Sequence, residues 1–310
     1  MKSALVLILC ISATGFFGIA VVLRQDTVEQ LKAVRQLTAL LARIPQHVEV
    51  PHIRQTPDQS FATESATAVL VSDIRTSTIL FQKDAAALRY PASTAKMMTA
   101  LVARKLFSLD QIMTVREEAF ADGSVIGFHL GEQVKVRDLL AVLLVHSGND
   151  SALVLANNAA GGYTAFIEEM NRTAKAMGLS STHFVNSSGL DDPKQQTSAQ
   201  DLEILGEAVL KDPVLAKLVS TKKITVTDIS GKIVHQMVNR NELLATVPGV
   251  FGIKTGTTDS AGENLVTALH THNRDVIVVL LGSHARYTET TEILNWLGSA
   301  VSWEMRSAPQ

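Results

Sequence analysis

Ser93 and Lys96 stand three residues apart, and this spacing could produce an activated nucleophile. A serine hydroxyl is a poor nucleophile at neutral pH and needs a positioned base. Because residues i and i+3 share a face of a helix, the Lys96 amine can reach the Ser93 hydroxyl. Lys96 is a base only when neutral, so burial or the nearby ammonium of Lys254 must lower its pKa. Taken alone, the pair also fits a helix-capping serine and a solvated lysine.

A second polar group follows an apolar helical run that ends near Val145. Ser147 could pass a proton to a leaving amine, and Asn149 could hold both Lys96 and a substrate amide, since an amide group donates and accepts. A simple polar turn between helices is the alternative. His146 is a further candidate base, although Lys96 already fills that role and histidine is often structural.

A third group lies at the end of an expected strand. Lys254 supplies positive charge and Thr255 a hydroxyl for a substrate carboxylate, while Gly256 lets a peptide approach the strand edge. The backbone N–H groups of Thr257 and Ser93 could form an oxyanion hole. Arg240 is a second candidate for the carboxylate, with an ordinary surface arginine as the alternative.

In this order, the three groups resemble the set found in serine penicillin-binding proteins and class A β-lactamases. The chain resembles most the low-molecular-mass penicillin-binding proteins of the D-alanyl-D-alanine carboxypeptidase family, over about residues 61–297. Further stretches carry this resemblance: Phe184-Val185-Asn186-Ser187-Ser188-Gly189-Leu190-Asp191, Thr197 to Leu202, Asn239 to Leu244, and Gly252 to Thr258 followed by Ala261-Gly262.

The resemblance implies that a peptidoglycan stem peptide ending in D-Ala-D-Ala acylates Ser93 and releases D-alanine. Water or another amine then resolves the acyl-enzyme, and β-lactams such as penicillins acylate the same serine and remain there. It also implies that Arg240 lies near the substrate carboxylate. No cofactor is expected. No metal site is expected either, because no cysteine or carboxylate cluster joins His270 and His272.

Two other functions remain open at this stage. A serine β-lactamase needs a carboxylate that activates the deacylating water. The one local look-alike, Glu168-Glu169-Met170-Asn171, lies in what resembles an ordinary helix. A non-catalytic module that binds wall peptides or β-lactams would lack some catalytic residue, whereas all of those expected are present.

The elements that must position these residues follow from periodicity and turn signals. Strands are expected at both ends of the body and helices between them, which predicts an α/β (α+β) fold. The resemblance implies that this is the penicillin-binding/β-lactamase-like transpeptidase fold, an antiparallel sheet flanked by helices with an inserted all-helical lobe. The expected strands are Ala68 to Ser72, Ser77 to Gln82, Ile224 to Val226, Phe251 to Thr255, Asn264 to His270 and Val276 to Leu281; the expected helices are Ser93 to Phe107, most of Val136 to Leu218, and Thr288 to Met305.

The N-terminal residues predict attachment to a membrane. The apolar run from Ala4 to Leu23 is long enough to span a bilayer as a helix and lacks a small-x-small exit, which favours an uncleaved anchor over a signal peptide. We therefore expect an anchor or signal peptide at 1–25, a stalk helix and linker at 26–60, and a catalytic domain at 61–310. The presumed substrate places that domain outside the cytoplasmic membrane, although the basic residues that follow the run favour the opposite orientation.

Composition excludes one class of partner. The 310 residues carry a net charge of −2, and no basic stripe or basic–aromatic run occurs, so no nucleic-acid partner is expected.

Overall fold

A computed structural model describes residues 8–11, 17–20, 34–35, 47–54, 65–119 and 121–307. The chain divides into two units, which are described separately: residues 53–301, and residues 1–52 together with 302–310. The larger unit contains every candidate site residue.

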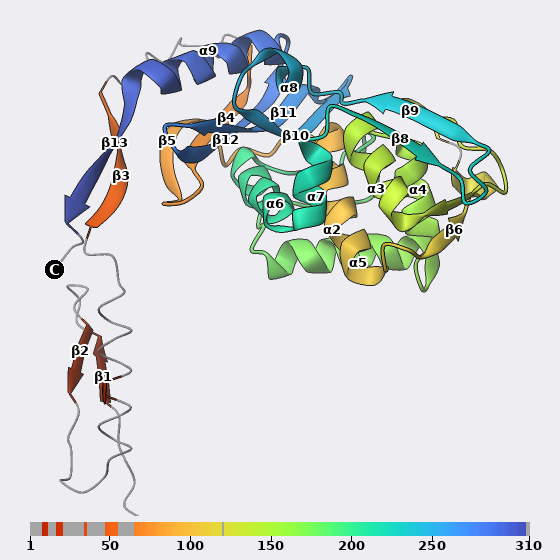
Figure 1. Cartoon of the computed structure of the whole chain (residues 1–310), viewed down its shortest axis with the longest axis horizontal. Helices are drawn as coiled ribbons and strands as arrows, with labels where there is room; N and C mark the ends of the chain where they lie inside the picture. Colours follow the sequence, from red (N-terminus) through yellow and green to blue (C-terminus); the bar gives the residue numbers. More distant parts are fainter. Residues whose placement is uncertain are drawn as a thin grey trace, which may run out of the picture. The chain divides into compact units, whose positions relative to one another are not determined.

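A five-stranded antiparallel sheet organises the larger unit (Figure 1). Its order is β10-β11-β12-β4-β5, so strands from both ends of the unit meet in one sheet, as the sequence predicts. The strands are β4 (Ala68–Asp73), β5 (Thr78–Lys83), β10 (Val250–Thr258), β11 (Gly262–Thr271) and β12 (Arg274–Ser283).

Both faces of this sheet are covered. The interior of β12 is buried almost throughout, which explains its continuous run of Val, Ile and Leu rather than an alternating pattern. The helix α9 (Arg286–Ala300) packs on β11 and β12, whereas α6 (Ala199–Lys211) packs on β4 and β12 from the other side (Figure 1). The predicted fold, an antiparallel sheet with flanking helices and a helical lobe, is confirmed.

The helical lobe comes from the middle of the chain. Its elements are η1 (Ala92–Ala95), α2 (Lys96–Leu106), β6 (Ile112–Thr114), η2 (Glu117–Ala119), β7 (Gln133–Lys135), α3 (Val136–Ala141), the π-helical turn η3 (Val142–His146), α4 (Asn149–Asn157), α5 (Gly162–Ala176) and α7 (Pro213–Val219). Local signals set some boundaries. The Ser198 hydroxyl accepts from the backbone N–H of Asp201 at the start of α6, and Asp212 with Pro213 opens α7.

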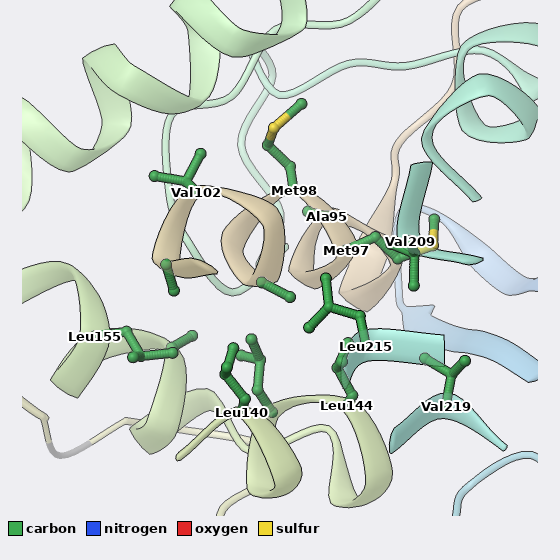
Figure 2. Close-up of a cluster of buried hydrophobic side chains, with 14 of the residues drawn as sticks. Ala95, Met97, Met98, Val102, Leu140, Leu144, Leu155, Val209, Leu215 and Val219 are labelled. Atoms are coloured by element: carbon green, nitrogen blue, oxygen red, sulfur yellow. The ribbon is translucent and has the colours of Figure 1, made fainter. Parts of the chain in front are cut away.

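The helix α2 lies at the centre of the apolar core. Figure 2 shows its side chains among those of α3, η3, α4, α6 and α7. Met97, Leu140, Leu144 and Leu215 are almost fully buried. Each such side chain contributes about 1.5–3 kcal/mol relative to exposure, so α2, which begins at Lys96, is held rigidly.

Two shorter elements follow α7. The hairpin β8 (Lys223–Thr227) and β9 (Val234–Val238) forms a separate two-stranded sheet, and α8 (Leu243–Thr246) precedes β10. The sequence predicts β8 but not β9, whose residues alternate between exposed and buried.

The predicted C-terminal helix is too long. The helix α9 ends at Ala300, and Val301–Ser307 is the strand β13, which pairs with β3 (His47–Ile53). Val301 and Trp303 favour a strand over a helix. The residues of β3 were expected to form an extended linker. Pro51 is compatible with the observed pair, because a strand in a two-stranded sheet has a free edge.

The N-terminal run is not helical where the structure describes it. Ile8–Ile11 and Phe17–Ala20 form an antiparallel pair, β1 and β2, rather than the predicted membrane helix. Their β-branched and aromatic residues favour strands. Among the described residues, no helix is long and apolar enough to cross a membrane. The predicted stalk helix lies outside the described residues except for Val34 and Arg35, which are helical.

Candidate active site

Ser93 and Lys96 are brought together at the start of α2. The Lys96 side chain is fully buried, and its Nζ lies 2.8 Å from the Ser93 Oγ. The same Nζ donates to the Asn149 side-chain oxygen at 2.7 Å and to the backbone carbonyl of Ser188 at 2.7 Å. Three acceptors therefore fix the amine beside the serine hydroxyl.

Burial changes the protonation of this lysine. It lowers the pKa of Lys96 from 10.5 to about 7, against the opposing effect of the carboxylate of Asp150. A substantial fraction of Lys96 is therefore neutral near physiological pH. Repulsion from Lys254 was also expected to lower this pKa, whereas burial is what lowers it in the structure.

A hydrogen bond connects Ser147 of the helical lobe with Lys254 of β10. Ser147 ends η3 with a left-handed backbone (φ 69°), and its Oγ accepts from the Lys254 Nζ at 2.9 Å. Lys254 also donates to the Thr255 carbonyl at 2.8 Å. Burial, followed by repulsion from Lys96, lowers the pKa of Lys254 well below its ordinary value.

Gly256 is needed for close packing against the nucleophile. A Cβ built on Gly256 would lie 2.8 Å from the Ser93 backbone nitrogen and 2.9 Å from the Ala92 Cβ. Gly189 abuts the same turn, where its Cβ would lie 1.8 Å from the Ala92 carbonyl oxygen. The turn that carries Ser93 is thus clamped between two glycines, a role the sequence does not reveal.

A small cavity of about 330 Å³ opens onto these groups. All nine predicted site residues either line it or hydrogen-bond to a residue that does: Lys96 to Ser93, Lys254 to Ser147, and the Asn149 backbone N–H to the Ser124 carbonyl. Its lining comes from the sheet, the helical lobe and the loops between them: Ser93, Ser124, Ser147, Arg240, Glu242, Thr255, Gly256, Thr257, Arg286 and Tyr287.

The cations of this cavity surround the end of β10. Thr257 is exposed, and its hydroxyl accepts from Arg286 Nη1 at 2.6 Å, while the same nitrogen donates to the Gly256 carbonyl at 2.9 Å. Arg240 is exposed and donates from its Nε to the His146 carbonyl at 3.3 Å. Lys254, Arg240 and Arg286 make this side of the cavity suited to a carboxylate.

His146 and Glu169 have other partners. His146 Nε2 lies 3.1 Å from the Val125 carbonyl, and burial together with Arg240 lowers its pKa. Glu169 lies on α5 and pairs with Lys105 at 2.7 Å and with Arg172. Neither ring nor carboxylate has a hydrogen bond to Ser93 or Lys96 among the described residues, which argues against a second base and against the deacylating carboxylate of a β-lactamase.

Sequence reasoning missed several groups at this site. The carbonyl of Ser188 and the cation of Arg286 contact the site residues directly. Asp150 holds the neighbouring segment, since its Oδ2 accepts from the backbone of Ile126 and Gly127 at 3.0 Å each. A signal existed only for Ser188 and Asp150, which lie within or beside noted motifs.

Known proteins are similar to this chain in sequence and in fold. The family model for the S11 peptidases, D-alanyl-D-alanine carboxypeptidase, matches residues 53–285, and the chain belongs to this family. It is 35% identical over 249 residues to D-alanyl-D-alanine carboxypeptidase DacA of Haemophilus influenzae, covering 75% of this chain and 61% of that protein. It is 31% identical to DacB2 of Mycobacterium tuberculosis, covering 73% of this chain and 80% of the relative.

Solved structures agree. The Streptomyces K15 DD-transpeptidase superposes with a TM-score of 0.71 at 28% identity, covering 75% of this chain and 96% of that one. D-alanyl-D-alanine carboxypeptidase DacD of Francisella tularensis gives a TM-score of 0.72 at 28% identity, covering 80% and 73%. The chain spans 61% of the length of DacA from Haemophilus influenzae.

Proposed function

We propose that this chain is a serine DD-peptidase that removes the terminal D-alanine of peptidoglycan stem peptides and is acylated by β-lactams. One observation carries the proposal: the buried Lys96 amine, with a pKa lowered to about 7, touches the Ser93 hydroxyl at 2.8 Å. This is the geometry of a nucleophile with its general base. Family membership supports the same substrate.

The proposed reaction assigns one role to each group. Neutral Lys96 takes the proton of Ser93 as its oxygen attacks the penultimate carbonyl, and the oxyanion receives hydrogen bonds from the N–H groups of Ser93 and Thr257. Ser147, which contacts Lys254, passes a proton to the leaving amine. Asn149 holds Lys96 in place.

The same proposal places the substrate carboxylate among the cations. Lys254, Thr255 and Arg240 bind the terminal carboxylate, and Arg286 holds the Thr257 hydroxyl by a hydrogen bond. Gly256 permits the peptide to lie along β10. Water then hydrolyses the ester and frees Ser93.

The location of the enzyme is part of the proposal. We propose a cytoplasmic-membrane protein with a single N-terminal pass and its body outside, supported by the apolar run at residues 4–23 and by a substrate that lies outside the membrane. The pairing of β1 with β2 does not support a helical pass. Membrane fractionation of the full chain, with and without residues 1–25, tests the attachment.

Mass spectrometry of the protein with a penicillin and with a D-Ala-D-Ala peptide tests the chemistry. We expect a long-lived adduct on Ser93 and release of D-alanine, both abolished in Ser93→Ala. Rapid turnover of the penicillin would indicate a β-lactamase, and no adduct would indicate a binding module. Retention of either reaction by Ser93→Ala would refute the nucleophile.

A further inference from the structure

Thr99 carries a buried hydroxyl one helical turn after the proposed base, and the reaction above does not use it. It lies on α2, is fully buried, and shares a face of the helix with Lys96. A threonine inside a helix can bond to the carbonyl four residues earlier. The Thr99 hydroxyl instead donates to the backbone carbonyl of Ser187 at 2.6 Å, with the Met170 sulfur at 3.9 Å as a weaker acceptor. Because a hydroxyl has one proton, the closer carbonyl oxygen receives it.

Two side chains on this face of α2 therefore hold two adjacent carbonyls. Lys96 Nζ donates to the Ser188 carbonyl at 2.7 Å, and Thr99 donates to the Ser187 carbonyl. The chain bends at both serines. Since peptide units are planar, only the φ and ψ angles of Ser188 separate the two carbonyls, so the position of one restricts the other. The Thr99 hydroxyl thus helps to fix the acceptor that Lys96 uses.

The rest of this segment is anchored on either side of the two carbonyls. The buried Gln195 side-chain oxygen accepts from the backbone N–H groups of Val185 and Asn186 at 2.9 Å each. The Asn186 side-chain oxygen accepts from the backbone N–H of Gly189 at 2.7 Å. Between these anchors, α2 supplies the donors to the two carbonyls, and it does so from the same turn that holds the base.

The Ser188 carbonyl in turn sets the direction of the Lys96 lone pair. A neutral amine has two N–H protons and one lone pair, and three polar groups surround this amine. The Ser188 carbonyl and the Asn149 side-chain oxygen only accept, whereas the Ser93 hydroxyl can also donate. The two protons therefore go to the two acceptors, and the lone pair faces the hydroxyl that must lose its proton. Without the Ser188 acceptor, the amine is free to turn a proton towards Ser93 instead.

We propose that Thr99 is a positioning residue for the general base: its hydroxyl holds the Ser187–Ser188 segment so that the Ser188 carbonyl keeps the lone pair of Lys96 directed at Ser93. The inference rests on the proposed function and deepens it. Ser187 is fully buried, and among the described residues no second donor reaches its carbonyl. Loss of the Thr99 hydroxyl leaves that carbonyl unpaired, and a shift of the segment towards another donor displaces the Ser188 carbonyl as well.

Three substitutions at Thr99 test the inference in the full chain, through the rate constant of penicillin acylation between about pH 5 and pH 9. Thr99→Ala leaves space in place of the hydroxyl, and Thr99→Val replaces it by a methyl group. Both should lower the plateau by about tenfold or more, because the base is misdirected. Both should also move the inflection to lower pH by about half a unit or more, since a lost acceptor destabilises the protonated amine.

Thr99→Ser is the conservative variant. It keeps the hydroxyl, so its rate constant should stay within about twofold of the wild type and its inflection should not move. The charged groups that face Lys96 among the described residues are Asp150 of α4 and Lys254 of β10, and all three variants retain them. A variant that only folds poorly keeps the inflection of the wild type, because the molecules that do fold react normally.

Thr290→Val is the matched control. Thr290 is also a fully buried helical threonine, on α9, but its hydroxyl has no hydrogen-bond partner among the described residues. Its replacement should leave both the rate constant and the inflection unchanged.

Tyr163→Phe tests the same segment without altering α2. The half-buried Tyr163 oxygen accepts from the Ser187 backbone N–H at 3.3 Å. Its removal should also move the inflection to lower pH, and this variant decides the question if neither Thr99→Ala nor Thr99→Val folds.

Four results would overturn the inference alone: wild-type kinetics in Thr99→Val, a lower rate without a moved inflection, equal losses in Thr99→Ser and Thr99→Ala, or an unmoved inflection in Tyr163→Phe when the other variants do not fold. Absence of any penicillin adduct in the wild type would instead overturn the proposed function, and the inference with it.

Discussion

A buried amine with three hydrogen-bond acceptors is the central feature at the scale of single residues. The Lys96 amine donates to Ser93, Asn149 and the Ser188 carbonyl. Complete burial disfavours its charged form and lowers its pKa. A lysine on the surface would stay protonated at neutral pH and could not accept a proton. The helical turn brings the Ser93 and Lys96 side chains together. The packing around them buries Lys96 and so lowers its pKa, which allows it to act as a base.

The pH dependence of acylation follows from this lysine. Because the protonated amine is inactive and its pKa is about 7, we expect the rate of penicillin acylation to rise with pH and to level off above an inflection near pH 7. Stopped-flow acylation between pH 5 and 9 measures this. A rate that stays flat across that range would contradict the assignment of Lys96 as the base.

Gly256 offers a second test at the same scale. In Gly256→Ala, the new Cβ meets the Ser93 backbone at 2.8 Å, so the turn must shift. A displacement of about 1 Å at a nucleophile costs on the order of 100-fold in rate, and we expect a loss of that size in penicillin acylation. Gly298→Ala is the control, because nothing lies within 4 Å of its added Cβ. An unimpaired Gly256→Ala enzyme would show that the turn yields freely.

At the scale of elements, the start of α4 joins a loop to the catalytic lysine. Asn149 contacts Lys96 through its side-chain oxygen and donates to the Asp122 carbonyl at 2.6 Å. The next residue, Asp150, accepts from the backbone N–H groups of Ile126 and Gly127. The first turn of α4 therefore holds the loop at 122–127 by hydrogen bonds. Its Asp150 carboxylate also raises the pKa of Lys96.

Asp150→Asn separates these two effects. The amide oxygen can still accept from the loop, but the negative charge that raises the pKa of Lys96 is lost. We expect the acylation inflection to move to lower pH. A purely structural role would lower the rate without moving the inflection, so the pH profile, rather than activity at one pH, is the measurement that decides.

At the scale of the whole molecule, the site lies where the sheet meets the helical lobe. The sheet carries Lys254, Thr255 and Gly256 on β10, and the lobe carries Ser147 and Asn149. The turn η1, with Ser93, packs directly on β10. Folding must therefore bury two lysines between the layers, which disfavours the folded state whenever they are charged.

Global stability should report this cost. The pKa of Lys96 falls from 10.5 to about 7 on folding, so the unfolded chain binds more protons between these values, and stability rises with pH across this window. Lys96→Met lacks the contribution of Lys96, whereas both proteins keep that of the buried Lys254. We expect the wild type to gain stability relative to Lys96→Met as pH rises from about 7 towards 10.5, measured by urea unfolding at several pH values. A constant difference between the two proteins would contradict the lowered pKa.

Short-range spacing allowed much of the fold and site to be predicted. The Ser93–Lys96 contact depends on one helical turn, and the β4–β5 and β11–β12 hairpins depend on local turns and apolar runs. The prediction that the C-terminal helix continues beyond Ala300 was wrong. An apolar run such as that around Val301 fits either a helix or a strand, and pairing of β13 with the distant strand β3 decided that it is a strand.

The sequence by itself determined which residue types could do the chemistry and which lie one turn apart. Only the tertiary structure decided which distant groups meet them. Lys254 reaches Ser147 across 107 residues of chain, and the Ser188 carbonyl reaches Lys96 across 92. Every residue has a backbone carbonyl, so the residue type of Ser188 does not predict its contact with Lys96. The sequence around Arg286 likewise does not predict that its side chain contacts Thr257, because tertiary packing decides that contact. Those contacts, and the burial that lowers the pKa of Lys96, arise from the packing of the whole domain.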